Sequence, residues 1–214
     1  MSTPIALQVD PLYIAQVSAR KETVAQNGSA SAALINQAFA QFQAGFEKRT
    51  AEIANMSGSR KKQIAVFLEL VSDVRAVAEP FVPCAKGCSA CCYQRVTIST
   101  LEAEYIAFNT GRAAKRVMPG APMKPIEAFG RGTPCTFLDG NGECSIYDSR
   151  PYMCRNYVTL DIDNLLCQTE NIQLTAERHP ASTGVPILGE GPLGILYRRI
   201  IKADAINDIR VFFS

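Results

Sequence analysis

The stretch Cys84-Ala-Lys-Gly-Cys88-Ser-Ala-Cys91-Cys92 decides how the rest of this 214-residue chain is to be interpreted. Glycine and other small residues separate the thiols, and they let a backbone turn sharply around a bound ion. A disulfide gains most by closing a long loop, so four cysteines this close together favour metal ligation over disulfides. A redox disulfide system and unligated core thiols are the alternatives. The stretch therefore predicts a metal-binding loop.

The other cysteines follow singly, and no cysteine lies before residue 84 or after residue 167. This downstream half has no C-x2-C pair of the kind that zinc sites commonly use. Three cysteines on one loop with a remote fourth are closer to the spacing of iron–sulfur proteins, so we favour an iron–sulfur cluster slightly over zinc. All eight cysteines are candidate metal ligands: Cys84, Cys88, Cys91, Cys92, Cys135, Cys144, Cys154 and Cys167.

The spacing also suggests which thiols share a site. Cys84, Cys88 and Cys91 lie on one loop, and we expect Cys154 to complete their site, because a short helix beginning near Pro151 would hold it firmly. Adjacent cysteines project in different directions, so Cys92 either serves a second site or is a packed thiol. The candidate second site consists of Cys92, Cys135, Cys144 and Cys167.

Four thiolates around zinc or an oxidised cubane leave a net negative charge that nearby cations must offset. Lys86, Arg95, Arg150 and Arg155 lie within five residues of a cysteine and are candidates for this role. Ordinary surface cations are an equally good interpretation of all four.

Composition excludes several classes of protein. Apolar residues make up 47% and charged residues 20%, as in globular proteins, and the net charge of +2 gives no field to attract nucleic acid. The longest apolar stretch, 64–71, is short and contains Glu69, so we expect no membrane span. The first five residues lack the basic region of a secretory signal, and we expect a cytoplasmic protein, possessing at most a protein partner.

The pattern of apolar residues predicts an α+β protein with a helical hairpin at its N-terminal end. Apolar residues recur at four-residue spacing from Ser31 to about Asn55, and a second helix is predicted from about Arg60 to Glu79, before Pro80. We divide the chain into a helical region (1–80), a cysteine module (81–170) and a C-terminal extension (171–214) that packs on the same core.

Shorter elements are predicted around the cysteines. Residues 93–99 alternate like a strand, and the capping box Ser99-Thr-Leu-Glu102 starts a helix that runs to about Asn109. The turn 139–142 predicts a hairpin, and Asp148 or Ser149 should cap the short helix that carries Cys154. A last helix contains Leu193, Leu196, Ile200 and Ile201.

Three weaker motifs are interpreted as structural. Gly189-Glu-Gly-Pro-Leu-Gly194 has the spacing of a dinucleotide-binding turn, but too little chain follows it for that fold, and we expect a simple turn. His179, the sole histidine, is expected at the surface rather than as a ligand. Asp161, Asp163 and Glu170 lack the spacing of a calcium loop and are expected to be solvated.

A longer string of residues resembles a known family. The loop C-x3-C-x2-C-C, then Pro134-Cys135-Thr-Phe-Leu138, then Ile146-Tyr147-x-x-Arg150-Pro151-x-x-Cys154-Arg155 is similar to the YkgJ-like CxxCxxCC family over residues 81–170. This family is described as a zinc- or iron-chelating domain and includes bacterial flagellin lysine N-methylases. The resemblance implies a metal or iron–sulfur centre built from the eight cysteines, but it does not imply methylation.

The C-x3-C-x2-C core also occurs in radical S-adenosylmethionine enzymes, which resemble partial (β/α) barrels, but no run of βα units follows the loop here. The sequence thus leaves three functions open. The first is a metal-binding protein whose iron–sulfur centre is structural or redox-active. The second is a zinc module that presents an interaction surface, and the third, by resemblance, is a protein-modifying enzyme.

Overall fold

The computed structural model describes residues 9–214 and confirms the α+β class. The expectation about the first five residues lies outside the described part of the chain. The helices are α1 (Pro11–Ala54), α2 (Arg60–Ala78), α3 (Thr100–Thr110), α4 (Tyr152–Asn156), α5 (Thr169–Ala176), α6 (Gly191–Ile201) and α7 (Ile209–Phe212). The strands are β1 (Thr97–Ser99) and β2 (Ile206–Asp208). No helix in residues 9–214 is long and apolar enough to cross a membrane.

The predicted helical hairpin is formed by α1 and α2, but α1 begins twenty residues before the predicted start. Asp10 caps it by accepting a hydrogen bond from the Leu12 amide at 2.8 Å, and Pro11 occupies the first turn. The helix continues through Gly28, where a Cβ would lie 3.2 Å from Cβ of Pro186. The glycine thus serves close packing inside the helix rather than ending it.

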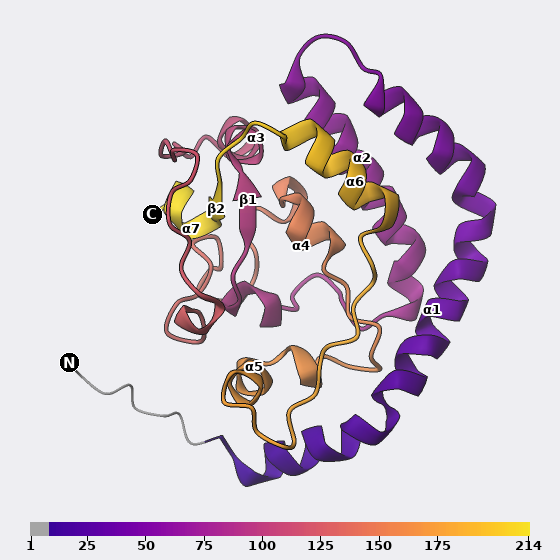
Figure 1. Cartoon of the computed structure of the whole chain (residues 1–214), viewed down its shortest axis with the longest axis vertical. Helices are drawn as coiled ribbons and strands as arrows, with labels where there is room; N and C mark the ends of the chain where they lie inside the picture. Colours follow the sequence, from indigo (N-terminus) through magenta and orange to yellow (C-terminus); the bar gives the residue numbers. More distant parts are fainter. Residues whose placement is uncertain (1–8) are drawn as a thin grey trace.

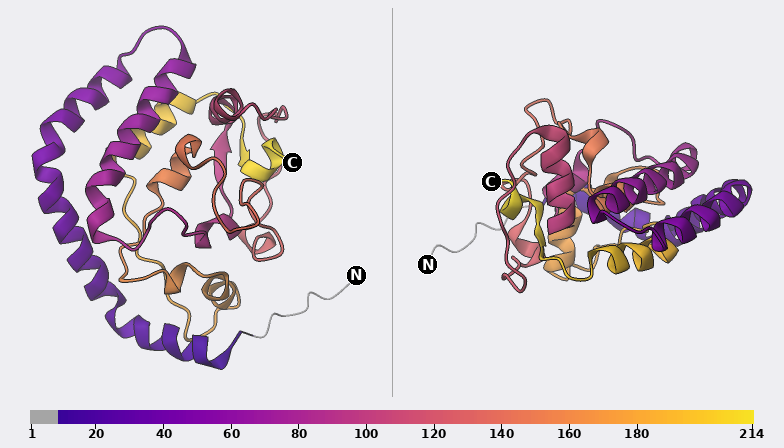
Figure 2. Two further views of the ribbon diagram at one scale, coloured as in Figure 1. Left: turned by 180° about the vertical axis from the view of Figure 1, so that it is seen from behind. Right: turned by 90° about the horizontal axis from the view of Figure 1, so that it is seen from above.

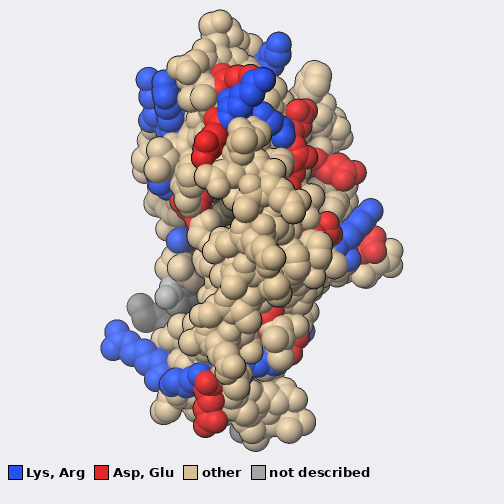
Figure 3. Space-filling view, turned by 90° about the vertical axis from the view of Figure 1, so that its right-hand side faces the viewer, with Lys and Arg blue, Asp and Glu red and all other residues tan. Residues whose placement is uncertain are grey.

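Helix α1 curves along one side of the molecule, from α5 at one end to α2 and α6 at the other (Figure 1). The two other views show that it stays at the outside of the fold along its whole length (Figure 2). Residues 23–46 contain no charged side chain. The face on which α1 lies accordingly shows charges gathered toward its ends and an uncharged surface between them (Figure 3).

The larger core is built between α1, α2, α4 and α6. Its centre is a group of three aromatic rings from three helices, Phe67, Tyr152 and Tyr197, with the two tyrosine rings 4.5 Å apart between centroids. A second core lies under the cysteine module and includes Ile98, Phe137 and the buried residues of the C-terminal turn. The C-terminal extension packs on both cores through α6 and α7.

The sheet has two antiparallel strands in which Thr97 pairs with Asp208 and Ser99 pairs with Ile206. The capping box at Ser99 is confirmed, and the strand predicted over 93–99 is present but covers only Thr97–Ser99. Strand β2 was not predicted, because a three-residue strand with only Ile206 apolar has no periodic signal.

A fully buried carboxylate joins three helices. Glu102 on α3 accepts hydrogen bonds from the Ser99 amide at 2.9 Å, from the Tyr152 amide at 2.8 Å and from the Tyr197 hydroxyl. Burial raises the pKa of Glu102, and the hydrogen bonds oppose that shift. Glu102, a member of the α3 capping box, therefore also fixes α4 and α6. Helix α4 carries Cys154.

The turn 139–142 is confirmed, since Asp139 accepts from the amides of Asn141 and Glu143 and a bridge pairs Leu138 with Cys144. The predicted cap of the following helix is wrong. Asp148 and Ser149 form a separate 3-10 turn, and α4 begins after Pro151, whose ring fixes the backbone. The glycine motif at 189–194 leads into α6, as expected of a turn.

Candidate metal centre

The cysteine loop connects the end of α2 to strand β1. It turns twice, first where the Cys88 amide donates to the Ala85 carbonyl at 3.1 Å, and again where the Cys92 amide donates to the Ser89 carbonyl at 2.8 Å. Within the first turn, Gly87 has a φ of 92°, a conformation that other residues rarely adopt. The loop therefore folds back on itself and brings its thiols onto the downstream cysteines.

Three cysteines form what we call the outer group: Cys84, Cys88 and Cys167. Burial, together with the negative charges of Cys84 and Cys88, raises the pKa of Cys167 to about 12, which identifies these thiols as neighbours. The Cys167 carbonyl accepts a hydrogen bond from the Gln94 side chain at 3.2 Å. This bond ties the 3-10 turn that carries Cys167 to the end of the cysteine loop.

Four cysteines form the cavity group: Cys92, Cys135, Cys144 and Cys154. The Cys135 amide donates to the Cys92 carbonyl at 2.7 Å, the hairpin presents Cys144, and α4 presents Cys154. Burial raises the pKa of Cys154 well above its ordinary value, and the charges of Cys135 and Cys144 add to this shift. A pKa raised in this way means that each thiolate needs an added positive charge to be stable.

A small enclosed cavity of about 40 Å³ lies between these cysteines. Apolar side chains close it, and Arg150 is the charged residue in its wall. Six of the eight cysteines line it: Cys88, Cys91, Cys92, Cys135, Cys144 and Cys154.

Cys91 lies between the two groups, because its charge acts on Cys84 and Cys167 as well as on Cys144 and Cys154. A hydrogen bond from the Cys92 thiol and the positive charge of Arg150 together lower the pKa of Cys91 to about 7, against the opposing effect of burial. The same hydrogen bond raises the pKa of Cys92. The pKa values of the two adjacent cysteines thus differ strongly, and Cys91 is the one that is more readily ionised.

Four cations were predicted to offset the charge of the thiolates, and Arg150 is best placed to do so. It lines the cavity, and its charge favours the ionised forms of Cys91, Cys144 and Cys154. Its guanidinium is held over the Tyr147 ring at 3.5 Å from the centroid. Lys86 lies over the same ring at 5.6 Å.

The other two predicted cations have mainly structural contacts. Arg155 is buried and donates to the carbonyls of Arg150 and Asp148 and to the Ser72 hydroxyl. Arg95 is directed to the Lys124 carbonyl.

Two further arginines at the centre were missed. Arg75, on α2, donates to the Cys84 carbonyl at 3.0 Å, and its charge favours the ionised forms of Cys84 and Cys91. Arg210, on α7, donates to the Cys92 carbonyl at 2.9 Å and lowers the pKa of Cys135, although burial outweighs this effect. Neither lies within five residues of a cysteine, so proximity in the sequence does not indicate their role.

The structure places Cys84, Cys88 and Cys91 close together with Cys167 beside them, whereas Cys154 lies near Cys91, Cys135 and Cys144. Helix α4 is anchored to the buried Glu102, and this contact fixes the position of Cys154. That Cys154 completes the site of Cys84, Cys88 and Cys91 stays a prediction.

The weaker motifs are placed as follows. The ring of His179 accepts a hydrogen bond from the Ala181 amide, a local contact. The prediction of a solvated acidic patch is wrong for Asp161, which is buried and forms an ion pair with Arg20. Asp163 pairs with the same arginine and Glu170 pairs with Arg131.

The donor set fits a thiophilic metal. Six of the eight thiols line one cavity together with apolar side chains and a cation that offsets negative charge, which is the chemistry that zinc and iron–sulfur centres require. In residues 9–214, no three histidine, cysteine, aspartate or glutamate side chains already converge on one point as a bound ion demands. Binding would therefore require the cysteine side chains to rotate about their Cα–Cβ bonds.

Comparison with known proteins gives one match. No curated protein and no solved structure matches the chain. Residues 83–178 match the model of the family CxxCxxCC, described as "Putative zinc- or iron-chelating domain". The matched segment contains β1, α3, α4, α5 and all eight cysteines, and the family is the one indicated by the resemblance. Over residues 83–178, less than half of its length, the chain is therefore similar to the CxxCxxCC family of zinc- or iron-chelating domains.

Proposed function

We propose that the protein binds metal through its cysteine groups and that the cavity group holds an iron–sulfur cluster with a structural or redox role. The observation that carries this proposal is the enclosed cavity lined by six cysteines and by apolar side chains. A single zinc ion is surrounded closely by its four ligands, whereas a cluster also needs room for inorganic sulfide. An enclosed space of about 40 Å³ between the thiols favours the cluster.

The ligands of the cluster would come from Cys92, Cys135, Cys144 and Cys154, with Cys91 adjoining them. Iron–sulfur clusters supply one-electron redox chemistry and a rigid cross-link between the segments that bind them. The guanidinium of Arg150 offsets the charge of the ionised thiols, and apolar residues such as Ile146 and Phe137 exclude water from them.

The outer group of Cys84, Cys88 and Cys167 is proposed as a second metal-binding set, with Cys91 available as its fourth thiol. The charge of Arg75 supports ionised Cys84. Cys84 and Cys167 are not in the wall of the enclosed cavity. A set without such a space between its thiols suits a single ion better than a cluster.

The test is anaerobic reconstitution of the purified protein with ferrous iron and sulfide, followed by visible absorption. Cys154→Ser should lose the cluster absorption, because it removes a ligand of the cavity group. Met153→Leu, a change of similar size at the neighbouring position of α4, should retain it. Cys167→Ser should leave the cluster in place and lower the total metal content, because it removes a ligand of the outer group only.

Two results would count against the proposal. Full cluster absorption in Cys154→Ser would exclude the cavity group as the ligand set. A colourless protein that takes up zinc alone, with all variants equally able to bind it, would favour the structural zinc module instead.

A further inference from the structure

The sulfur of Cys88 in the outer group has a side-chain neighbour that offers it a hydrogen bond. The Asn164 side-chain amide donates to Cys88 Sγ at 3.9 Å, within the longer range of hydrogen bonds to sulfur. Asn164 precedes the 3-10 turn that carries Cys167, so the residue that contacts one outer cysteine also leads into another.

The loop that holds Asn164 is fixed from both sides by carboxylates. Asp163 accepts from the Leu165 amide at 2.9 Å, and Asp161 accepts from the Ile162 amide at 2.9 Å. These are local bonds that shape the loop. They would not by themselves fix it relative to the rest of the protein.

Contacts with helix α1 fix this loop relative to the rest of the protein. The guanidinium of Arg20 binds both carboxylates, with Asp163 held through two nitrogens at 2.7 and 3.0 Å, and Asn27 donates to Asp161 at 3.0 Å. Asp161 is 1% exposed, so it is desolvated. A buried ion pair gives little net stability compared with apolar side chains, and its directional hydrogen bonds instead specify one arrangement of the groups it joins.

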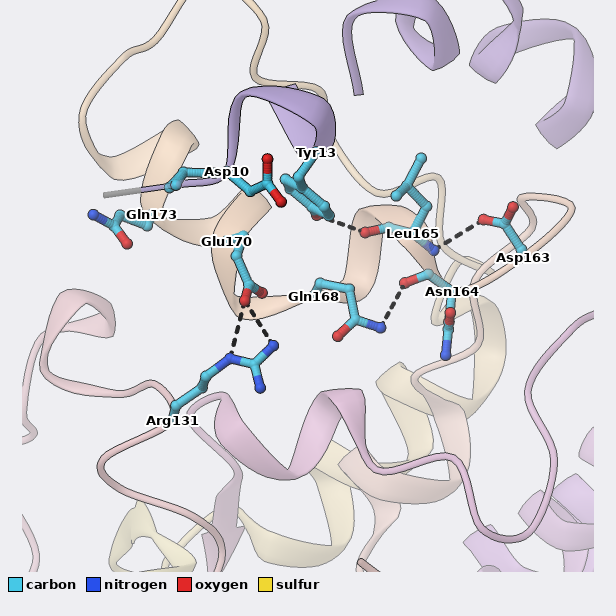
Figure 4. Close-up of a pocket in the computed structure, with 10 residues that line it drawn as sticks. Asp10, Tyr13, Arg131, Asp163, Asn164, Leu165, Gln168, Glu170 and Gln173 are labelled. Carbon is cyan, nitrogen blue, oxygen red and sulfur yellow. Dashed lines mark hydrogen bonds and ion pairs between the residues drawn. The ribbon is translucent and has the colours of Figure 1, made fainter. Parts of the chain in front are cut away.

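The same asparagine lines an open hollow of about 600 Å³. Figure 4 shows Asn164 and Asp163 at one side of this hollow, opposite Tyr13 and Glu170. Asn164 therefore stands between a surface hollow and the sulfur of Cys88.

We propose that Asn164 is a positioning residue of the outer metal group, which donates a hydrogen bond to the Cys88 ligand and is held there by Arg20 of α1. This inference rests on the proposed function. A thiolate bound to metal keeps negative charge on sulfur, and an amide donor stabilises that charge and orients the ligand. The long helix thereby sets the affinity of a centre to which it contributes no ligand.

The test uses the full chain, zinc alone as the probe and a competing chelator to measure affinity, with cobalt substitution to monitor the sulfur-to-metal charge-transfer band. Asn164→Ala should weaken binding about 10-fold, the lower end of the usual effect of removing such a partner. Asn164→Asp should weaken it further, because an acceptor then faces the sulfur. Ile162→Ala, an exposed position on the same loop, is the matched control and should bind as the unchanged protein does.

Arg20→Gln tests the contribution of α1. It should weaken zinc binding and shift the cobalt band as Asn164→Ala does, and the double variant should be no weaker than the single ones, because both act through one hydrogen bond. Affinity in Asn164→Ala equal to that of Ile162→Ala, with metal still bound, would overturn the inference alone. Failure of the unchanged protein to bind zinc or cobalt would overturn the proposed function, and this inference with it.

Discussion

Removing the Tyr197 hydroxyl tests most directly whether the hydrogen bonds of the buried Glu102 carboxylate hold α4 in place. Tyr197→Phe removes a donor from a fully buried carboxylate and changes little else, because the ring remains packed on Phe67 and Tyr152. A hydrogen bond to a charged group contributes about 2 kcal/mol, and for a chain of this length the loss corresponds to about 4–8 °C in Tm. The assay is thermal unfolding followed by circular dichroism.

The structure offers a matched control on the neighbouring ring. The Tyr152 hydroxyl is buried and, among the described residues, has no hydrogen-bond partner. Tyr152→Phe should therefore leave Tm unchanged or raise it, since it removes an unsatisfied polar group. Equal losses of stability in the two variants would refute the interpretation of Glu102 as the residue that the Tyr197 hydroxyl stabilises.

The effect of Tyr197→Phe should also depend on pH. Burial raises the pKa of folded Glu102 above its unfolded value, so the folded state binds more protons and stability falls as the pH rises through this interval. The Tyr197 hydroxyl opposes that shift by stabilising the charged form. Removing this hydroxyl should therefore lower the free energy of unfolding only slightly at pH 4, where the carboxyl is protonated, and more at pH 7. A loss that is the same at both pH values would contradict this account.

Three further predictions concern the core, the hairpin and the metal. Phe67→Ala, at a fully buried ring, should destabilise the protein by about 3–5 kcal/mol in denaturant unfolding, and a loss under 1 kcal/mol would show that the aromatic group is not the centre of the core. Gly142→Ala, at a φ of 78°, should cost about 1–2 kcal/mol and weaken metal binding through Cys144, while Gly140→Ala in the same turn should cost less. Treatment with a chelator should lower the melting temperature of residues 81–170 while α1 and α2 retain part of their helical signal, and a single unchanged transition would oppose a stabilising role for metal.

Local patterns predicted the elements whose cause lies within a few residues. The capping box at Ser99, the turn at Asp139 and the helical periodicity of α2 each depend on near neighbours, and each is found in the structure. The start of α1 was missed because an Asn-Gly-Ser patch normally ends a helix, and here Gly28 is retained for contact with Pro186.

The errors concern contacts between distant parts of the chain. Arg20 pairs with Asp161 across 141 positions, and Arg210 reaches Cys92 across 118, so neither could be inferred from spacing. The positions of Cys154 and Cys167 have the same origin, because they depend on where α3 and α1 hold two separate loops. Sequence spacing identified the thiols but not the way in which the fold divides them. The proposed division of the chain at residues 80 and 170 remains a prediction.

The measurement that tests the central claim most directly is the iron, zinc and acid-labile sulfide content of the protein purified without oxygen. The account predicts a brown protein with iron and sulfide in matching amounts, both of which are lost in Cys154→Ser, together with a further metal ion that is lost in Cys167→Ser. A folded protein that carries neither metal nor sulfide, with all 8 thiols free to react, would contradict it.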